Sequence, residues 1–246
     1  NYYDNYYIKE FAIIDKTNSE YDEFIIFDEH NLKRESILES ESLPFKIKVF
    51  DYFINCEPVQ KVYLGNENFH GMAKNFYLQP LKSEKEYEKN RPGIIYEIYG
   101  LNNPEIDGLY ILFFGQTIPQ TLQYDNKKYE FVLRPYRTYL PFKIELLDFN
   151  KTMHPGTDVA KSFSSEVNLI IDDISRKVMI KMNEPLRHSN YTFYQASFIE
   201  ENNKQTTVLA TVKNYGRLFP YISSVIMCIG ILLHLIIMGL GIQKRK

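Results

Sequence analysis

The sequence predicts a mainly β protein: a two-part antiparallel ectodomain, β-sandwich-like or an open barrel, followed by one C-terminal transmembrane α-helix. Two observations predict this class. Short runs of alternating apolar and polar residues recur through residues 1–217, and the strand-favouring residues Tyr and Phe number 20 and 17. Residues 219–242 then carry no charge, and these 24 residues are enough to cross a bilayer core of about 30 Å as a helix.

Within the first 217 residues, three segments have the pattern of β-hairpins. We expect their turns at residues 125–128, around 172–177 and at 201–204, where polar residues separate two alternating runs. Two windows favour a helix instead, at residues 31–40 and 82–90. The second window is nearly all charged, so a solvated loop is the alternative there.

The pentapeptide Leu-Pro-Phe-Lys-Ile occurs twice, at residues 43–47 and 140–144. Every second residue is apolar in both copies, which predicts two half-buried strands that each start just after a proline. The apolar positions are Phe45, Ile47 and Val49 in the first copy and Phe142, Ile144 and Leu146 in the second. The repeat is either a coincidence among common strand residues or the mark of two related sheet halves.

Four parts are therefore expected. A first β-rich half covers residues 1–115, a second covers 116–217, the transmembrane helix covers 218–243, and a short basic tail covers 244–246. The basic tail predicts a cytoplasmic C-terminus, because positively charged flanks stay inside, and this places the β-rich body on the extracytoplasmic side. The chain opens on Asn1 without a signal peptide, so we expect a preceding segment to export the body.

One stripe of the predicted helix differs from the rest. Small and polar residues recur there at spacings of three and four, which predicts a packing face toward another membrane helix. The stripe contains Ser223, Met227, Gly230, His234, Ile237 and Gly241. An ionisable side chain inside a membrane is costly, so His234 is the informative residue. The alternatives for it are an interhelical hydrogen bond, a haem or metal ligand, or a proton relay.

The sequence lacks the common catalytic motifs. It contains no Gly-rich phosphate loop, no Gly-x-Ser-x-Gly, no Cys-x-x-Cys and no His-Glu-x-x-His. His154 and Asp158 stand four apart, but Pro155 and Gly156 predict a turn between them rather than a metal site. We therefore expect no catalytic residue and no metal ligand set. Without the three basic residues of the tail, 26 basic residues stand against 31 acidic ones, a balance of −5, which argues against nucleic acid as a partner.

Several motifs follow one another in the second half of the chain. A strand ending in Asp148 leads to His-Pro-Gly-Thr, then to Met-Asn-Glu-Pro-Leu, to Tyr-Thr-Phe-Tyr-Gln and to Lys-Asn-x-Gly-Arg before the apolar segment. In this order and spacing the chain resembles the ResB/CcsB family of cytochrome c biogenesis proteins. The resemblance is strong over residues 116–240 and weaker before residue 116.

The resemblance implies a function. Members of this family form one half of the System II apparatus for cytochrome c maturation, which moves haem to the outer face of a bacterial inner membrane or a thylakoid-type membrane. The partner, CcsA (ResC), is fused or separate, and the two together act as a haem lyase, or cytochrome c synthase, on an apocytochrome c. The chain would be a subunit of that complex rather than a catalyst alone.

The family also suggests roles for particular residues. His234 becomes the candidate haem-binding residue of this chain. His154, Arg187 and His188 lie in motif segments that could contact the apocytochrome. The alternative reading is a membrane-anchored β-sandwich that binds a protein or a carbohydrate through surface tyrosines and has no haem role.

Overall fold

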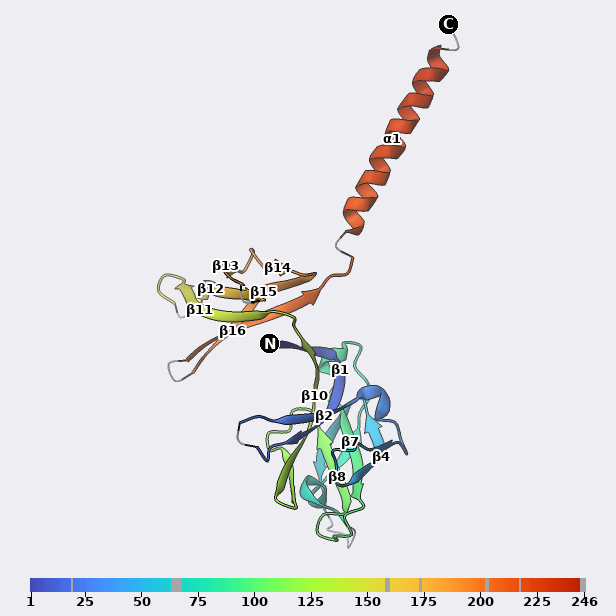
Figure 1. Cartoon of the computed structure of the whole chain (residues 1–246), viewed down its shortest axis with the longest axis vertical. Coiled ribbons are helices and arrows are strands. Elements are labelled where there is room, and N and C mark those ends of the chain that lie inside the picture. Colours follow the sequence, from blue (N-terminus) through green and yellow to red (C-terminus); the bar gives the residue numbers. More distant parts are fainter. Residues whose placement is uncertain are drawn as a thin grey trace. The chain divides into compact units, whose positions relative to one another are not determined.

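A computed structural model of the chain describes residues 1–18, 20–62, 68–157, 160–172, 174–201, 204–216 and 218–243 (Figure 1). The strands are β1 (Tyr2–Asp15), β2 (Glu23–Asp28), β3 (Ile37–Leu38), β4 (Lys46–Phe53), β5 (Cys56–Gln60), β6 (Phe76–Pro80), β7 (Gly93–Tyr99), β8 (Gly108–Phe113), β9 (Gln120–Tyr124), β10 (Lys127–Tyr139), β11 (Lys143–Met153), β12 (Ala160–Ile171), β13 (Ile174–Lys181), β14 (Leu186–His188), β15 (Tyr191–Glu201) and β16 (Lys204–Lys213). The helix α1 (Phe219–Gln243) follows them. The predicted class, mainly antiparallel β with one C-terminal apolar helix, is confirmed.

The chain divides into two compact units, Tyr2–Tyr139 and Leu140–Lys246, the second together with Asn1. The boundary between the units therefore follows Tyr139, whereas the sequence placed it after Gly115. The reason is the pairing of β9 and β10. Both strands belong to the sheet order β2-β1-β10-β9, so the segment that was expected to open the second half completes the first unit instead.

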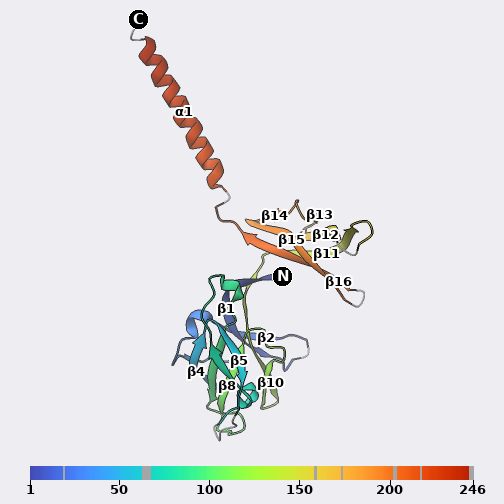
Figure 2. The same cartoon turned by 180° about the vertical axis from the view of Figure 1, so that it is seen from behind.

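The first unit, blue to green in Figure 1, is built from two four-stranded sheets. The sheet β2-β1-β10-β9 and the sheet β3-β4-β7-β8 share one core between their inner faces, and β5 and β6 form a separate hairpin, whose β5 is labelled in Figure 2. The ring of Phe11 on β1 lies 5.4 Å from that of Tyr96 on β7, and both are fully buried. Burial of such side chains contributes roughly 1.5–3 kcal/mol each.

The second unit pairs two three-stranded sheets, β11-β12-β13 and β14-β15-β16. The ring of Phe149 on β11 lies 5.1 Å from that of Phe198 on β15, so the two sheets pack on each other. The buried apolar side chains of this unit are Phe142, Phe149, Val167, Leu169, Ile180, Leu186, Tyr191 and Phe193.

The three predicted hairpins are confirmed. β9 turns into β10 at Asp125 and Asn126, whose φ angles of 47° and 60° are those of a tight primed turn. β12 and β13 pair up to Ile171 and Ile174, and β15 and β16 pair up to Glu201 and Lys204.

The two helical windows turn out differently from each other. The window 31–40 is not helical. It contains the strand β3, which pairs with β4, and Glu35 takes a φ of 66° that no right-handed helix allows. In the window 82–90 the structure holds only a 3₁₀ turn at Tyr87–Lys89, so the solvated-loop alternative is confirmed.

Both copies of the repeated pentapeptide lead into strands. In β4 the alternation is complete, because Phe45, Ile47 and Val49 are all buried. In β11 it is weaker: Phe142 is buried, but Ile144 is only half-buried, as is Leu146 just before a β-bulge. β4 lies inside its sheet whereas β11 is an edge strand, which explains the difference in burial.

A buried ion pair joins β1 to β10. Glu10 and Arg134 face each other across the two strands, and Arg134 Nε lies 2.7 Å from Glu10 Oε1. Their side chains are 1% and 8% exposed. The guanidinium also lies over the ring of Phe24, at 5.2 Å from its centroid. Removing one charge from such a pair is far costlier than removing both, because the remaining charge stays buried.

We therefore expect Glu10→Gln to lower the free energy of unfolding by about 3 kcal/mol. The free energy of unfolding of the double variant, Glu10→Gln with Arg134→Met, should be closer to that of the wild type. Urea denaturation followed by circular dichroism measures both values. The more exposed pair Lys16–Glu130, also 2.7 Å apart and with side chains 38% and 16% exposed, is the control: Lys16→Gln should cost less than about 1 kcal/mol. If Glu10→Gln and Lys16→Gln lowered the free energy of unfolding equally, burial would not govern how much these ion pairs stabilise the fold.

Candidate functional site

The helix α1 is long and apolar enough to cross a membrane over Phe219–Met238. It contains two serines, and the chain itself satisfies both hydroxyls. Ser223 Oγ donates a hydrogen bond to the carbonyl oxygen of Phe219 at 2.6 Å, and Ser224 Oγ donates one to that of Pro220 at 2.8 Å. Serine hydroxyls are tolerated in an apolar environment when they bond to the preceding turn in this way. The predicted tail 244–246 lies outside the described residues.

The predicted packing face of α1 is open in this structure. Met227 is 65% exposed, and a Cβ added at Gly230 would meet no atom within 4 Å. Gly241 lies in the last turn, where the structure describes only the backbone. His234 is exposed and forms no hydrogen bond or ion pair with any described residue of the chain. The roles of Ser223, Met227, Gly230, His234 and Gly241 stay predictions.

Two of the predicted contact residues, Arg187 and His188, are neighbours on β14 but differ in their surroundings. His188 is half-buried. Its ring stands edge-on to the buried ring of Phe142 at 4.8 Å, and its Nε2 lies 3.0 Å from Ser189 Oγ. Arg187 is exposed and makes no ion pair with any residue that the structure describes. His188 therefore covers the edge of the core, whereas the guanidinium of Arg187 is exposed and has no partner within the described part of the chain.

The third predicted contact residue, His154, lies in an exposed turn after β11. Thr157 N donates to the carbonyl oxygen of His154 at 3.1 Å, and Gly156 takes a φ of 75°. Asp158, which the sequence places four residues after His154, lies outside the described residues. Among the residues that are described, His154 contacts neither Arg187 nor His188, so the structure does not bring the three together into one site.

A buried polar network lies at the centre of the second unit, and sequence reasoning missed it. Ser165 Oγ on β12 donates to Gln195 Oε1 on β15 at 2.6 Å and lies 2.8 Å from Thr207 Oγ1 on β16. Gln195 Nε2 donates to Thr207 Oγ1 at 2.6 Å and to the carbonyl oxygen of Ser197 at 3.2 Å. Ser165 and Gln195 are 0% and 6% exposed. Gln195 is the last residue of the Tyr-Thr-Phe-Tyr-Gln motif, so this motif glutamine joins the two sheets.

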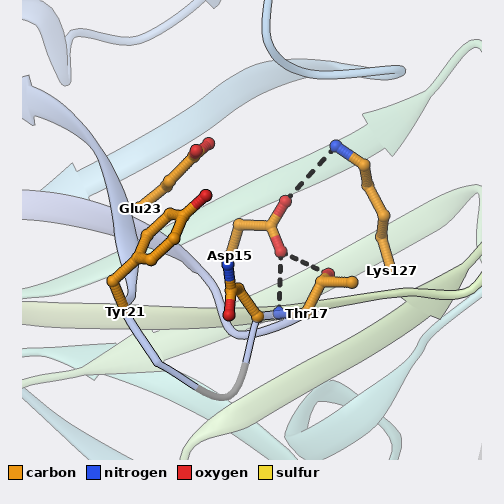
Figure 3. Close-up of a pocket in the computed structure, with 6 residues that line it drawn as sticks. Asp15, Thr17, Tyr21, Glu23 and Lys127 are labelled. Carbon is orange, nitrogen blue, oxygen red and sulfur yellow. Dashed lines mark hydrogen bonds and ion pairs between the residues drawn. The ribbon is translucent and has the colours of Figure 1, made fainter.

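A further candidate site lies at one end of the first unit, where a cavity of about 480 Å³ opens (Figure 3). Asp15 lies at its centre and accepts hydrogen bonds from Thr17 N at 2.9 Å and from Thr17 Oγ1. Lys127 Nζ lies 3.4 Å from its other oxygen, and the side chains of Tyr21 and Glu23 line the cavity beside it. Burial favours a raised pKa of Asp15, but the hydrogen bonds from Thr17 and Lys127 outweigh it, so the pKa lies below its ordinary value.

Metal binding has no structural support within the described residues, because no three His, Cys, Asp or Glu side chains gather there. Cys56 is buried against Leu78, and burial raises the pKa of its thiol to about 11. A thiol with so high a pKa is almost entirely protonated near neutral pH and is a poor nucleophile or ligand.

The chain thus combines a body of antiparallel sheets with one helix that is long and apolar enough to anchor it in a membrane. Residues 100–216 match the model of the ResB-like family, which confirms the resemblance to the ResB/CcsB family drawn from the motifs. The matched stretch begins directly after β7 and covers β8 to β16, so it includes every described strand of the second unit. A search of curated proteins found no match.

We expect Gln195→Met to loosen the second unit, because it keeps the volume of the side chain but removes its hydrogen bonds to Ser165, Ser197 and Thr207. The loss should be about 1–3 kcal/mol of local stability. Hydrogen exchange measured by mass spectrometry reports it as faster exchange in peptides from β12, β15 and β16. The same change at the exposed Gln123 of β9 is the control and should leave exchange unaltered. Unchanged exchange in Gln195→Met would mean that apolar packing alone holds the two sheets together.

Proposed function

We propose that this chain is the extracytoplasmic domain and a membrane span of a ResB/CcsB-like component of the System II machinery for cytochrome c maturation. The observation that carries the proposal is the family match over residues 100–216, which ends just before a helix of membrane-spanning length. The body would lie on the outer side of a bacterial inner membrane or a thylakoid-type membrane, and the C-terminus in the cytoplasm.

In this role the chain works with a CcsA/ResC-like membrane protein, fused or separate, and is a subunit of a haem lyase rather than a catalyst alone. Haem is the substrate. Its two vinyl groups each take up one thiol of the apocytochrome, so that S–H adds across a C=C bond and no oxidant is needed. The haem and the thiols supply this chemistry, and the protein supplies position. Packed β-sheets on a chain that continues into a helix of membrane-spanning length are suited to positioning.

His234 is the residue of this chain that we assign to haem. An imidazole nitrogen is a common axial ligand of haem iron, and the His234 ring is exposed and has no partner within the described chain. Residue 234 stands about 22 Å along the helix from Phe219, at 1.5 Å per residue, which is past the middle of a core of about 30 Å. The face with Ser223, Met227, Gly230 and Gly241 would dock on the haem-handling partner.

His234→Ala should lower the haem content of the complex purified with its partner, because an axial ligand is lost. Added imidazole should restore the haem. The Soret absorbance per protein measures both effects. Ile236→Ala, two positions along the helix and off the predicted face, is the matched control and should keep its haem. A His234→Ala complex that keeps its haem but dissociates more readily would reduce the role of His234 to a helix–helix contact.

The apocytochrome would bind to the body as an extended segment, adding to a free strand edge through backbone hydrogen bonds. β16 is such an edge. It spans ten residues without proline and carries charge only at its two ends, so it lacks the usual protection of an edge strand. Arg187, exposed and unpaired among the described residues, lies on β14 at the opposite edge of this sheet, and His154 lies in the exposed turn after β11. These two side chains would therefore contact parts of the apocytochrome outside the added strand.

We expect Arg187→Ala to weaken capture of an apocytochrome peptide about ten-fold, because a charge-assisted hydrogen bond is lost. Arg187→Lys should retain part of the affinity. Fluorescence anisotropy of a labelled peptide containing Cys-x-x-Cys-His measures this. Arg176→Ala on β13, which also removes an exposed arginine, should bind as the wild type does. Equal affinity of the Arg176 and Arg187 variants would remove Arg187 from the contact surface.

The alternative, a membrane-anchored module that binds a protein or a carbohydrate without a haem role, predicts a colourless complex. A Soret band in the complex purified with its partner therefore separates the two functions, whichever residue binds the haem.

A further inference from the structure

The two sheets of the first unit open toward solvent at one end, which we call the mouth of the unit. At this end the inward-facing residues of neighbouring strands are polar or aromatic instead of aliphatic. Asp15 on β1 pairs with Tyr129 on β10, and Lys127 on β10 pairs with Tyr124 on β9. Directly opposite residues of an antiparallel pair project on the same face, so these side chains gather at the end of the shared core.

The mouth contains a second cavity of about 230 Å³, beside the one in Figure 3. Lys127 lines both. The second cavity is lined by Glu41, Ser42, Leu43, Pro44, Tyr124, Asp125, Lys127 and Tyr129. It therefore combines a loop that leads into β4 with the turn between β9 and β10, so both sheets of the unit contribute to it. Its volume is below that of sites for drug-sized molecules, which suits a single side chain.

Tyr129 has a feature that the fold does not explain. Its side chain is 0% exposed, and its ring stands edge-on to that of Phe45 at 5.3 Å. Its hydroxyl is buried and has no hydrogen-bond partner among the residues that the structure describes. Most buried polar side chains have a partner, because an unpaired one costs stability. A phenylalanine would fill the same place in the core without this cost.

The hydroxyl of Tyr129 lies among the charges of the mouth. Burial raises its pKa, nearby Lys127 opposes the rise, and Asp15 and Asp125 add to it. These three charged residues also line the cavities, together with Glu23 and Glu41. The hydroxyl thus offers an unused hydrogen-bonding group where the cavity begins.

The charges that remain unpaired at the mouth are negative. Lys127 is held by Asp15, and Lys16 is held by Glu130. Glu23, Glu41 and Asp125 make no ion pair within the described chain. A carboxylate or a phosphate would be repelled here, whereas an ammonium or a guanidinium would be attracted and could also lie against tyrosine rings.

We propose that the mouth of the first unit binds a cationic side chain, a lysine or an arginine, presented by a partner polypeptide. Glu41 and Asp125 supply the opposite charge, Tyr129 Oη accepts a hydrogen bond from the cation, and Tyr124 provides an aromatic wall. The proposal does not depend on haem, and it assigns the first unit a binding role separate from that of the second unit.

The test uses the full chain in detergent with tyrosine rings labelled for NMR, and the Tyr129 signal is assigned by its loss in Tyr129→Phe. The probe is the capped peptide Gly-Gly-Lys-Gly-Gly, and the matched peptide carries acetyl-lysine. We expect the lysine peptide to shift the Tyr129 signal and the acetylated peptide to bind at least about ten-fold more weakly, since the charge is lost. Equal binding of the two peptides, or no shift with either, would overturn the proposal.

Substitutions at the mouth test whether the lysine peptide binds there. Glu41→Gln and Asp125→Asn should each weaken the lysine peptide about ten-fold, while Glu57→Gln, an exposed carboxylate on β5, should not change it. Asparagine also tolerates the positive φ of residue 125, so this turn is preserved.

Tyr129→Phe separates a binding role from a structural one. It should weaken binding of the lysine peptide, followed in this variant by the ring signal of Tyr124, which also lines the second cavity. It should leave the urea midpoint unchanged or higher, because a hydroxyl without a partner among the described residues is removed. A lower midpoint would show that an ordered water satisfies the hydroxyl as part of the fold, which would contradict the proposal. A shift of the Tyr129 ring signal by the sugar maltotriose but not by the lysine peptide would also overturn it, in favour of carbohydrate binding.

Discussion

The pairing of β1 with β10 is the constraint on which the first unit depends. It joins residues as far apart in sequence as Glu10 and Arg134, 124 positions, and it encloses a buried ion pair that neither strand could hold alone. The inner face of the same ladder provides Phe11, Ile13 and Phe131 to the core and ends in Asp15 and Tyr129 at the mouth. Closing so long a loop costs entropy, and the buried apolar surface and the paired charges offset that cost.

In the second unit, a network of polar side chains rather than a buried ion pair joins the sheets. Its sheets are only three strands wide, so they enclose less apolar area, and a network of Ser165, Gln195 and Thr207 lies in the middle of the packing. A satisfied polar network specifies one arrangement of the sheets, since any other would leave these groups unpaired. The motif glutamine of the ResB-like segment is thus understood as a structural residue. The side chains of Arg187 and His234, by contrast, are exposed and make no hydrogen bond or ion pair with the residues that the structure describes.

Many of the strands and turns could be predicted from local patterns in the sequence. The hairpin turns follow from residues that tolerate positive φ, such as Asp125 and Asn126, and the strand at Phe45, Ile47 and Val49 follows from strict alternation. The window 31–40 was misjudged because its helical composition gives way to the pairing of β3 with β4. Local patterns also could not show that His188 packs on Phe142, which lies far from it in sequence; its contact role stays a prediction. The mouth could not be predicted from the sequence, because Asp15 on β1 and Tyr129 on β10 are distant in sequence and meet only when the two strands pair.

The sequence by itself determined the β class, the apolar helix with His234 on its stripe, the hairpins and the resemblance to the ResB/CcsB family, since each depends on the order and periodicity of nearby residues. Only the tertiary structure decided that the first unit ends at Tyr139 and that Gln195 binds Ser165. It also decided that Tyr129 lies buried beside Asp125 and Lys127 with a hydroxyl that has no partner in the described part of the chain. The physical reason is that burial and pairing between distant strands are properties of the packed sheets, and local periodicity carries no information about which strand becomes the neighbour of which.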